Sequence, residues 1–472
     1  MVGISSKPSN LDPRFALDAP SQRICQLLFD GLILLDNHLR ISPHLATKWD
    51  IKNDKLYRFY LRKDAKFPDG TPITAQDLAT TLNQILDPNF GSPLKAGFSN
   101  IESVATPDPH TLDIALKEPQ ASFLTDLTLV KALPHRTQDT SEKAFKKHLM
   151  GSGPYKMVSQ TQNKIVLEKN PTYFGAQPKF KKIIFKVVKE DSTKLLKLKK
   201  GELDLIQNDL NADTLLQLKN EANLSLTQSP GISYSYLGMN LKDPILKNLK
   251  VRKAIAHALN RQEIIQHLFH GLVSPAQSLL SPLNWYFEKN VQTYEYAPHT
   301  AKTLLKQTKL ALPIKLSFKT STDEQSVNVA RIIADQLRAV GFEVELQTNE
   351  WGTFFRDIKN GNSQLFSLRW VGITDPDIYY TAFHTDQFAP EGRNRVFYSN
   401  SKMDKWLEEG RTTLSDDKRK KIYSKIQKQT NQDLPYIHLW HYDNVAIYTT
   451  RLRGFYFHPQ ANFTPFMEMW KE

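Results

Sequence analysis

Apolar and polar residues alternate along several short segments of the chain, as they do in β-strands with one buried face. Residues 56–67 show this alternation and end at the turn sequence Pro68-Asp69-Gly70. Residues 99–116 show it again around a Pro-Asp-Pro turn at 107–109, which predicts a β-hairpin. Between these strands a helix is predicted to begin after Thr74, where apolar residues take up the helical period.

In two longer segments the spacing of apolar residues is first that of a strand, then that of a helix, and then that of a strand again. The first runs from Ile183 to Ile206 and the second from Ile314 to Leu346. In the second segment the helical spacing stops just before Gly341, a residue suited to the left-handed end of a helix. Because strands joined through a helix normally pair in parallel, both segments predict sheets covered by helices. The chain is therefore predicted to be a large α/β protein with β-rich insertions and two lobes.

Length and charge restrict the interpretation of this α/β chain. It has 472 residues, which predicts several domains at roughly 100 to 200 residues per domain. No apolar run approaches the roughly 18 residues that a membrane span requires. The net charge of +13 suggests an acidic partner or a membrane surface. However, the nine lysines from 179 to 200 interleave with apolar residues, as on the solvated face of a buried element. No nucleic-acid partner is therefore predicted.

Familiar enzyme and metal-site motifs do not occur in the sequence. GxSxG, HExxH and GxxxxGK followed by Ser or Thr are absent, and GSGPY at 151–155 lacks the third glycine of a dinucleotide fingerprint. The His pairs at 267/270 and 438/441 have no third ligand nearby. The single cysteine, Cys25, lies in an apolar stretch and is predicted to be a buried, unreactive thiol. No catalytic residue, metal or cofactor is predicted.

The best site candidate from the residue pattern is the loop that begins at Trp370. It follows a predicted strand, Leu365 to Leu368, and is punctuated by Asp375, Pro376 and Asp377. Aromatic residues are concentrated in this last third of the chain. Because ligands of open α/β sheets bind beyond the carboxyl ends of strands, this loop is predicted to contact a ligand.

Short motifs follow one another along nearly the whole chain: LDPRF, LLFDGL, PHLATKW, LRKDAKFPDGTPITAQDL, GSGPY, YLGMN, VRKAIAHALNRQEII, EWGTF, RWVGITDPD, GRNRVFYSN and DLPYIHLW. In this order they resemble the extracytoplasmic solute-binding proteins of ABC importers. The resemblance is to the large peptide/nickel class, family 5, which includes oligopeptide- and dipeptide-binding proteins.

The resemblance implies a bilobal periplasmic-binding-protein fold (type II, cluster C) with an extra β-rich inserted domain. Lobe I would comprise residues 1–35, 151–238 and 445–472, the inserted domain II residues 36–150, and lobe III residues 239–444. Two connecting segments would form a hinge, and the ligand would be enclosed between the lobes.

The function implied by the resemblance is the binding of a solute without any chemical reaction. A monomer would bind an oligopeptide or peptide-like solute in the interlobe cleft and deliver it to an ABC permease in the cytoplasmic membrane. The location would be periplasmic or otherwise extracytoplasmic, with a lipoprotein anchor left open. The start, MVGISSKPSN, lacks signal-peptide features, so a mature or trimmed chain is expected. A regulatory ligand sensor of the same fold, a hydrolase, and a non-peptide solute such as a metal chelate remain alternatives.

Family cleft segments match eight positions in this sequence, which are expected ligand-binding residues: Gly153, Trp351, Arg369, Trp370, Val371, Gly372, His438 and Trp440. Asp375, in the same loop as Trp370, is added to them as a candidate. One position departs from the family pattern, because Ile373 stands where peptide-binding members carry an aspartate for the peptide's terminal amine. Asp375 either replaces that aspartate through a shifted loop or is, with Asp377, a structural turn residue.

Overall fold

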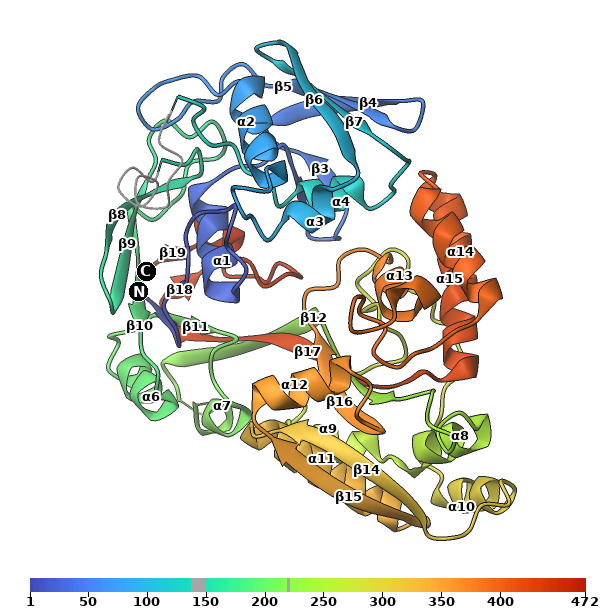
Figure 1. Cartoon of the computed structure of the whole chain (residues 1–472). Coiled ribbons are helices and arrows are strands. Elements are labelled where there is room, and N and C mark those ends of the chain that lie inside the picture. The colour runs from blue at the N-terminus through green and yellow to red at the C-terminus, as the bar shows by residue number, and fades with distance from the viewer. Residues whose placement is uncertain (137–149, 219–220) are drawn as a thin grey trace. The chain divides into compact units, whose positions relative to one another are not determined.

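The computed structural model describes residues 1–136, 150–218 and 221–472 (Figure 1). These residues form two compact units, the first made of Met1–Ser229 with Asn444–Glu472 and the second of Pro230–Asp443. Each passage of the chain from one unit to the other falls inside a strand, in β12 (Leu224–Met239) and in β17 (Tyr436–Thr449). None of the helices in this described part of the chain is long and apolar enough to cross a membrane.

The first unit contains a mixed sheet whose central strand, β1, the sequence pattern does not predict. Next to the C-terminal half of β17, the strands follow the order β11-β1-β10-β9-β8. The predicted strand-helix-strand segment is present as β10, α6 and β11, but β1 lies between its strands and pairs in parallel with both. The elements of this part are β1 (Val2–Ile4), α1 (Ala19–Leu28), β8 (Tyr155–Gln160), β9 (Lys164–Lys169), β10 (Lys182–Val187), α6 (Asp191–Lys199), β11 (Leu205–Gln207), α7 (Ala212–Leu218), β18 (Leu452–Arg453), η2 (Thr464–Met467) and β19 (Trp470–Lys471).

The same unit contains a separate four-stranded antiparallel sheet with its own apolar core. The predicted hairpin and helix are confirmed here, and Thr74 and Asp77 form the capping box of α2. Apart from β2, which precedes residue 36, this region lies within the predicted insertion at 36–150, while the division into three domains stays a prediction. Its elements are β2 (Ile33–Leu35), β3 (Ile41–Pro43), β4 (Ala46–Lys52), β5 (Leu56–Leu61), α2 (Ala75–Leu86), α3 (Lys95–Phe98), β6 (Ile101–Asp108), β7 (Thr111–Leu116) and α4 (Phe123–Leu127).

The second unit is built on strands in the order β15-β14-β16-β12, with β13 paired to β17. The predicted segment from 314 to 346 is confirmed, since β14 and β15 pair in parallel and α11 lies along them (Figure 1). Gly341, which follows α11, has a positive φ of 118°. The elements are α8 (Leu249–Ala258), α9 (Arg261–His267), β13 (Val273–Pro275), α10 (Pro298–Lys306), β14 (Ile314–Ser321), α11 (Glu324–Arg338), β15 (Phe342–Asn349), α12 (Trp351–Lys359), β16 (Leu365–Trp370), α13 (Ile378–Phe383), η1 (Thr385–Gln387), α14 (Ser401–Thr412) and α15 (Asp416–Asp433).

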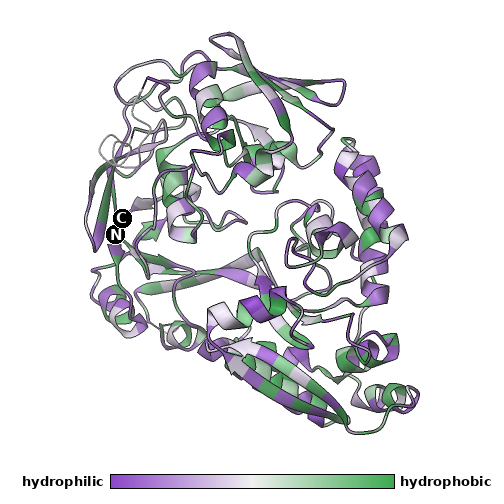
Figure 2. Ribbon diagram, viewed as in Figure 1, coloured by the Kyte–Doolittle hydropathy of each residue, from purple (hydrophilic) through white to green (hydrophobic). Residues whose placement is uncertain are grey.

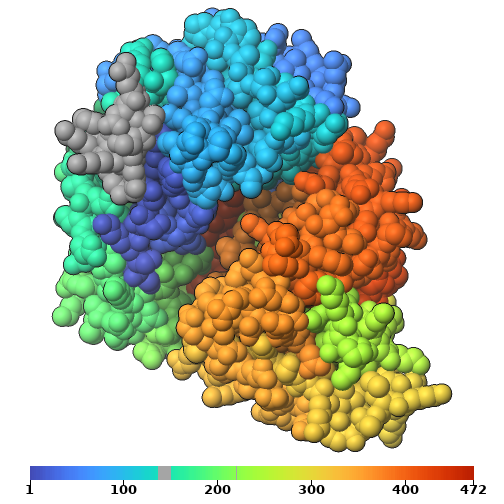
Figure 3. Space-filling model, viewed as in Figure 1, coloured from blue at the N-terminus to red at the C-terminus, as the bar shows by residue number. Residues whose placement is uncertain are grey.

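Helix α15 buries little apolar surface for its length. It is mostly hydrophilic in Figure 2, and with α14 it contributes to the outer surface of the second unit in Figure 3. Ile422, Tyr423 and Ile426 nevertheless reach an apolar core that also contains residues of β16 and α13. The helix is therefore held by a narrow buried stripe, and Arg419 on that stripe is itself buried.

The GSG segment at 151–153 packs its backbone against the end of α1. The N–H of Gly153 donates to the carbonyl of Leu28 at 2.9 Å. A Cβ at Gly151 would lie 1.9 Å from the Leu28 oxygen, and one at Gly153 would lie 2.6 Å from the Leu27 oxygen. Glycine is required here because a side chain would force two backbone segments apart.

We predict that Gly151→Ala lowers the free energy of unfolding by at least about 1 kcal/mol, since the new methyl group collides with a backbone atom that cannot move easily. Thermal or urea unfolding followed by circular dichroism measures the change. The matched control is Gly97→Ala, because a Cβ at Gly97 meets nothing within 4 Å. Equal stability of the Gly151 and Gly97 variants would contradict the packing account.

Candidate functional site

The loop after β16 exposes two residues and anchors a third. Val371 is 71% exposed, and Gly372 adopts a positive φ of 68° that suits glycine. The chain then turns inward, where the side chain of Ile373 is buried and its N–H donates to the carbonyl of Ile232 at 3.1 Å. The loop thus presents Val371 and Gly372 to solvent, while Ile373 fixes its path.

Asp375 is engaged by a buried arginine. Arg419 on α15 donates from Nη2 to Oδ1 of Asp375 at 2.7 Å and from Nη1 to Oδ2 at 3.0 Å. The two side chains are only 3% and 14% exposed. Burial acts to lower the pKa of Arg419, but Asp375 outweighs it and raises that pKa. Both carboxylate oxygens therefore have a structural partner, and a role for Asp375 in binding a ligand amine stays a prediction.

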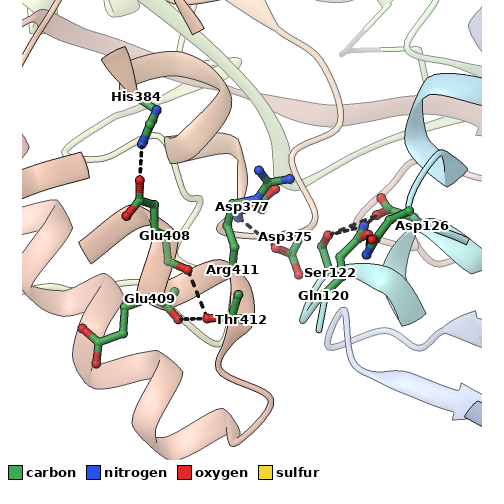
Figure 4. Close-up of polar contacts among 12 residues, drawn as sticks. Gln120, Ser122, Asp126, Asp375, Asp377, His384, Glu408, Glu409, Arg411 and Thr412 are labelled. Carbon is green, nitrogen blue, oxygen red and sulfur yellow. Dashed lines mark hydrogen bonds and ion pairs between the residues drawn. The ribbon is translucent and has the colours of Figure 1, made fainter. Parts of the chain in front are cut away.

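Asp377 forms a second, looser pair two residues further on. Nε of Arg411 lies 3.2 Å from Oδ1 of Asp377, and Figure 4 shows the two side chains together with Asp375. The N–H of Asp377 also donates to Oδ1 of Asp375 at 2.8 Å, which closes the turn. Burial raises the pKa of Asp377 to about 6, although Arg411 opposes the shift. The acidic residues of the loop are thus held by arginines of α14 and α15.

One group of side chains in the second unit, joined by ring and cation–π contacts, is called here the aromatic–arginine surface. It consists of Trp351, Phe355, Arg395 and Trp370. Trp351 begins α12, where the Glu350 side chain caps the helix by accepting from the N–H of Gly352, and its ring is 55% exposed. It stacks on Phe355 with ring centroids 5.6 Å apart and an interplanar angle of 14°.

Arg395 lies between the two tryptophans that the sequence predicts as ligand contacts, Trp351 and Trp370. Its guanidinium carbon lies 5.1 Å from the centroid of Phe355 and 5.2 Å from that of Trp370. Such contacts orient a guanidinium over aromatic rings and add a favourable cation–π interaction. Trp351 and Trp370 therefore belong to one region of the second unit, with Phe355 and Arg395 between them, while their contact with a ligand stays a prediction.

The other predicted site residues lie in different surroundings. Arg369 is exposed, and its guanidinium carbon lies 4.8 Å from the centroid of Tyr442. Trp440 is 1% exposed and packs against Phe269 in an apolar core. Gly153 belongs to the first unit and serves the backbone packing described above. A direct contact of Arg369, Trp440 or Gly153 with a ligand stays a prediction.

His438 is a buried member of a hydrogen-bond network. Burial, followed by Arg261 and His441, lowers its pKa to about 3, so the ring is neutral at pH 7. Nε2 lies 3.1 Å from Oδ1 of Asn431, and Nδ1 is hydrogen-bonded to the hydroxyl of Tyr234. A neutral ring that donates from Nε2 and accepts at Nδ1 satisfies both contacts. His438 also lines a cavity of about 20 Å³, enough for a water molecule.

Phe355 and Arg395 were not among the residues selected from the sequence. Phe355 lies one helical turn after Trp351, a spacing that places two side chains on one face. Arg395 lies in the GRNRVFYSN motif, but its ring contacts depend on the fold and not on local spacing. In the described part of the chain, no group of three His, Cys, Asp or Glu side chains is arranged to hold a metal ion.

Comparison with known proteins identifies related chains. The family model described as "Bacterial extracellular solute-binding proteins, family 5 Middle" matches residues 40–389. The oligopeptide-binding protein AppA of Bacillus subtilis is 24% identical, over 100% of this chain and 91% of that protein. The dipeptide-binding protein of Escherichia coli is 25% identical, over 85% of this chain and 81% of that protein.

The fold predicted from the sequence is confirmed by solved structures. The periplasmic binding protein DppA from Helicobacter pylori, solved in complex with the peptide STSA, superimposes with a TM-score of 0.81. It is 26% identical, and the match covers 100% of this chain and 97% of that structure.

We predict that ionisation of Asp377 makes the folded protein less stable between about pH 4 and pH 6. The pKa of Asp377 is about 6 in the folded chain, above the roughly 3.9 of an unfolded aspartate. The folded state therefore binds the proton of this carboxyl more tightly than the unfolded state does. The stability that this proton contributes is lost as the pH rises through the folded pKa. The stability of Asp377→Asn relative to the unmodified protein should therefore rise by roughly 1 to 3 kcal/mol from pH 4 to pH 7.

Urea unfolding at a series of pH values measures this difference. Asp386→Asn is the control for the loss of a carboxylate at the surface, because the Asp386 side chain is 77% exposed. A difference for Asp377→Asn that does not vary with pH would contradict the raised pKa.

Proposed function

We propose that this chain, which belongs to the bacterial extracellular solute-binding proteins of family 5, captures an oligopeptide or peptide-like solute and delivers it to an ABC importer. The observation that carries the proposal is the aromatic–arginine surface of the second unit. An exposed tryptophan stacked on a second ring beside an arginine offers aromatic area and a cation that one ligand can contact together. The relatives named for oligopeptides and dipeptides indicate which ligands to test first.

A peptide suits the surface because it offers both apolar and polar groups along one chain. The rings of Trp351 and Phe355 provide apolar contact area, and each buried ring removes roughly 150 to 250 Å² from water. Arg395 adds a cation and several hydrogen-bond donors in fixed geometry. Orientation would thus come from the arginine, while the rings supply contact without strict selection of side chains.

Binding without chemical change is part of the proposal. The loop acids that could act as general bases, Asp375 and Asp377, are held by Arg419 and Arg411. Differential binding is sufficient for transport, because contacts made only in a closed form shift the population toward the form that a permease accepts. Capture between two closing lobes, a monomeric state, a periplasmic or lipid-anchored location and a permease partner all belong to this proposal.

We predict that Trp351→Ala weakens peptide binding by at least about 1 kcal/mol, which is roughly fivefold in Kd, because a ligand ring or methylene loses its stacking partner. Calorimetric titration with an equimolar pool of synthetic tetrapeptides measures the affinity. Trp285→Ala is the matched control, since Trp285 is a partly exposed tryptophan of the same unit outside the aromatic–arginine surface. An unchanged affinity of the folded Trp351 variant would remove this residue from the site.

A second prediction separates the two interpretations of Asp375. Because its carboxylate holds Arg419, Asp375→Asn should weaken binding of free-amine peptides and of N-acetylated peptides by the same factor. The measurement is a pair of titrations with tetrapeptides that differ only in acetylation. A loss confined to free-amine peptides would instead show that Asp375 supplies the amine partner missing at Ile373.

A further inference from the structure

The solvent-facing side of helix α15 carries a row of lysines, which we call the lysine ridge. Its members are Lys418, Lys421, Lys425 and Lys428, and all of them are exposed. They follow one another at intervals of three, four and three residues, so they share one side of the helix. The buried residues of α15 lie on the opposite side. At 1.5 Å per residue, the ridge extends over roughly 15 Å.

The lysine ridge is only weakly neutralised by the protein itself. Nζ of Lys428 lies 3.4 Å from Oε2 of Glu288. The other three lysines form no ion pair with any residue that the structure describes. Asp417 lies in the first turn of the helix, and the sequence after it has no acidic residue before Asp433. The exposed side of α15 is therefore positively charged along most of its length.

This arrangement does not help to hold α15 in place. Like charges three or four residues apart on a helix repel one another and slightly destabilise it. The helix is attached to the second unit from its other side, through Ile422, Tyr423 and Ile426 in the apolar core and through the pair of Arg419 with Asp375. An external group of negative charges would relieve the repulsion along the ridge.

An exposed aromatic ring flanks the lysine ridge. Trp285 is 41% exposed, and Nζ of Lys420 lies 3.7 Å from the centroid of its ring. The hydroxyl of Tyr286 donates to Oδ1 of Asp416 at 2.6 Å and so fixes this segment to the first turn of α15. Tryptophan and lysine together are typical of surfaces that meet a bilayer, because the indole ring lies at the level of the headgroups and the ammonium groups attract anionic lipid.

The composition of this surface favours a bilayer over a protein or a nucleic acid. A protein interface usually has an apolar centre, but the residues beside the lysines, Ser424, Gln429 and Gln432, are polar. Single-stranded nucleic acid is usually bound by a series of stacking rings, and Trp285 is a single ring. A bilayer with anionic lipid requires neither feature, because each lysine close to it gains from the surface potential.

We propose that the lysine ridge, with Trp285 beside it, binds the surface of a bilayer that contains anionic phospholipid. The inference goes beyond the proposed function, because none of these residues belongs to the aromatic–arginine surface. It assigns different roles to the two sides of α15. The buried side holds the loop after β16 through Arg419, and the exposed side contacts lipid headgroups.

Co-sedimentation of the full chain with vesicles tests the inference. Vesicles of phosphatidylcholine alone are compared with vesicles of phosphatidylcholine and phosphatidylglycerol in equal parts. We expect the unmodified protein to bind the anionic vesicles at least about tenfold more strongly in about 0.05 M salt, and to lose this preference in about 0.5 M salt, where charges are screened over a few ångströms.

A variant with Lys418→Gln, Lys421→Gln and Lys425→Gln should bind the anionic vesicles at least about tenfold more weakly, since each lysine at such a surface contributes roughly fivefold. Trp285→Ala should weaken binding by a smaller factor. The matched control combines Lys250→Gln, Lys302→Gln and Lys306→Gln, which removes the same charge from exposed positions of the same unit outside α15. It should change the binding less than about twofold.

Three results would overturn the inference. The first is that the unmodified protein does not bind anionic vesicles in low salt. The second is an equal loss in both triple variants, which would show that the net charge of +13 acts without a defined site. The third is tighter binding to polyglutamate or to a DNA duplex than to vesicles of equal negative charge, which would assign the ridge to that partner. Peptide binding should be the same in the ridge variant and the unmodified protein, so each of these results leaves the proposed function standing.

Discussion

The ion pair between Asp375 and Arg419 is the interaction on which the candidate site depends. Both side chains are mostly buried, and removal of one partner from such a pair destabilises a protein by about 3 to 5 kcal/mol because the other charge is left without compensation. The pair ties the loop after β16 to α15, a helix with only a narrow apolar stripe. It thereby determines which residues of the loop face solvent and which of its acidic side chains are paired within the protein.

The charged side chains around this loop therefore differ in whether they have an ion-pair partner. The loop acids are neutralised by Arg419 and Arg411, whereas Arg395 lies against aromatic rings without a carboxylate partner in the described chain. A site that can recognise a buried ammonium needs an available acid, and a site that can recognise a carboxylate needs an available cation. The acids of this loop are already paired with arginines, and Ile373, which lies between them and Gly372, is apolar and buried.

Local sequence patterns were sufficient for most of the framework. The capping box at Thr74 and Asp77, the hairpin at 99–116 and the parallel pair β14 and β15 follow from the spacing of apolar and turn residues. β1 could not be predicted in the same way, because three residues are too few to establish a period, and its position is fixed by pairing with two distant strands.

The candidate site was only partly predictable for a related reason. The sequence pattern located Trp370 and its loop, since a strand followed by punctuating Pro and Asp residues is a local signal. It could not show that Trp440 would pack in a core, because β17 is buried on both faces there and alternation carries no information. Arg395 is one of 62 Lys and Arg residues, and what distinguishes it is its position against the rings of Phe355 and Trp370, which only the folded chain reveals.

A crystal structure of the protein purified together with the solute it carries is the measurement that tests this account most directly. The account predicts a solute stacked against Trp351 and Phe355 and an unbroken pair between Asp375 and Arg419. A solute whose ammonium group is bound by Asp375 with Arg419 displaced, or a solute that leaves Trp351 and Phe355 uncovered, would contradict it.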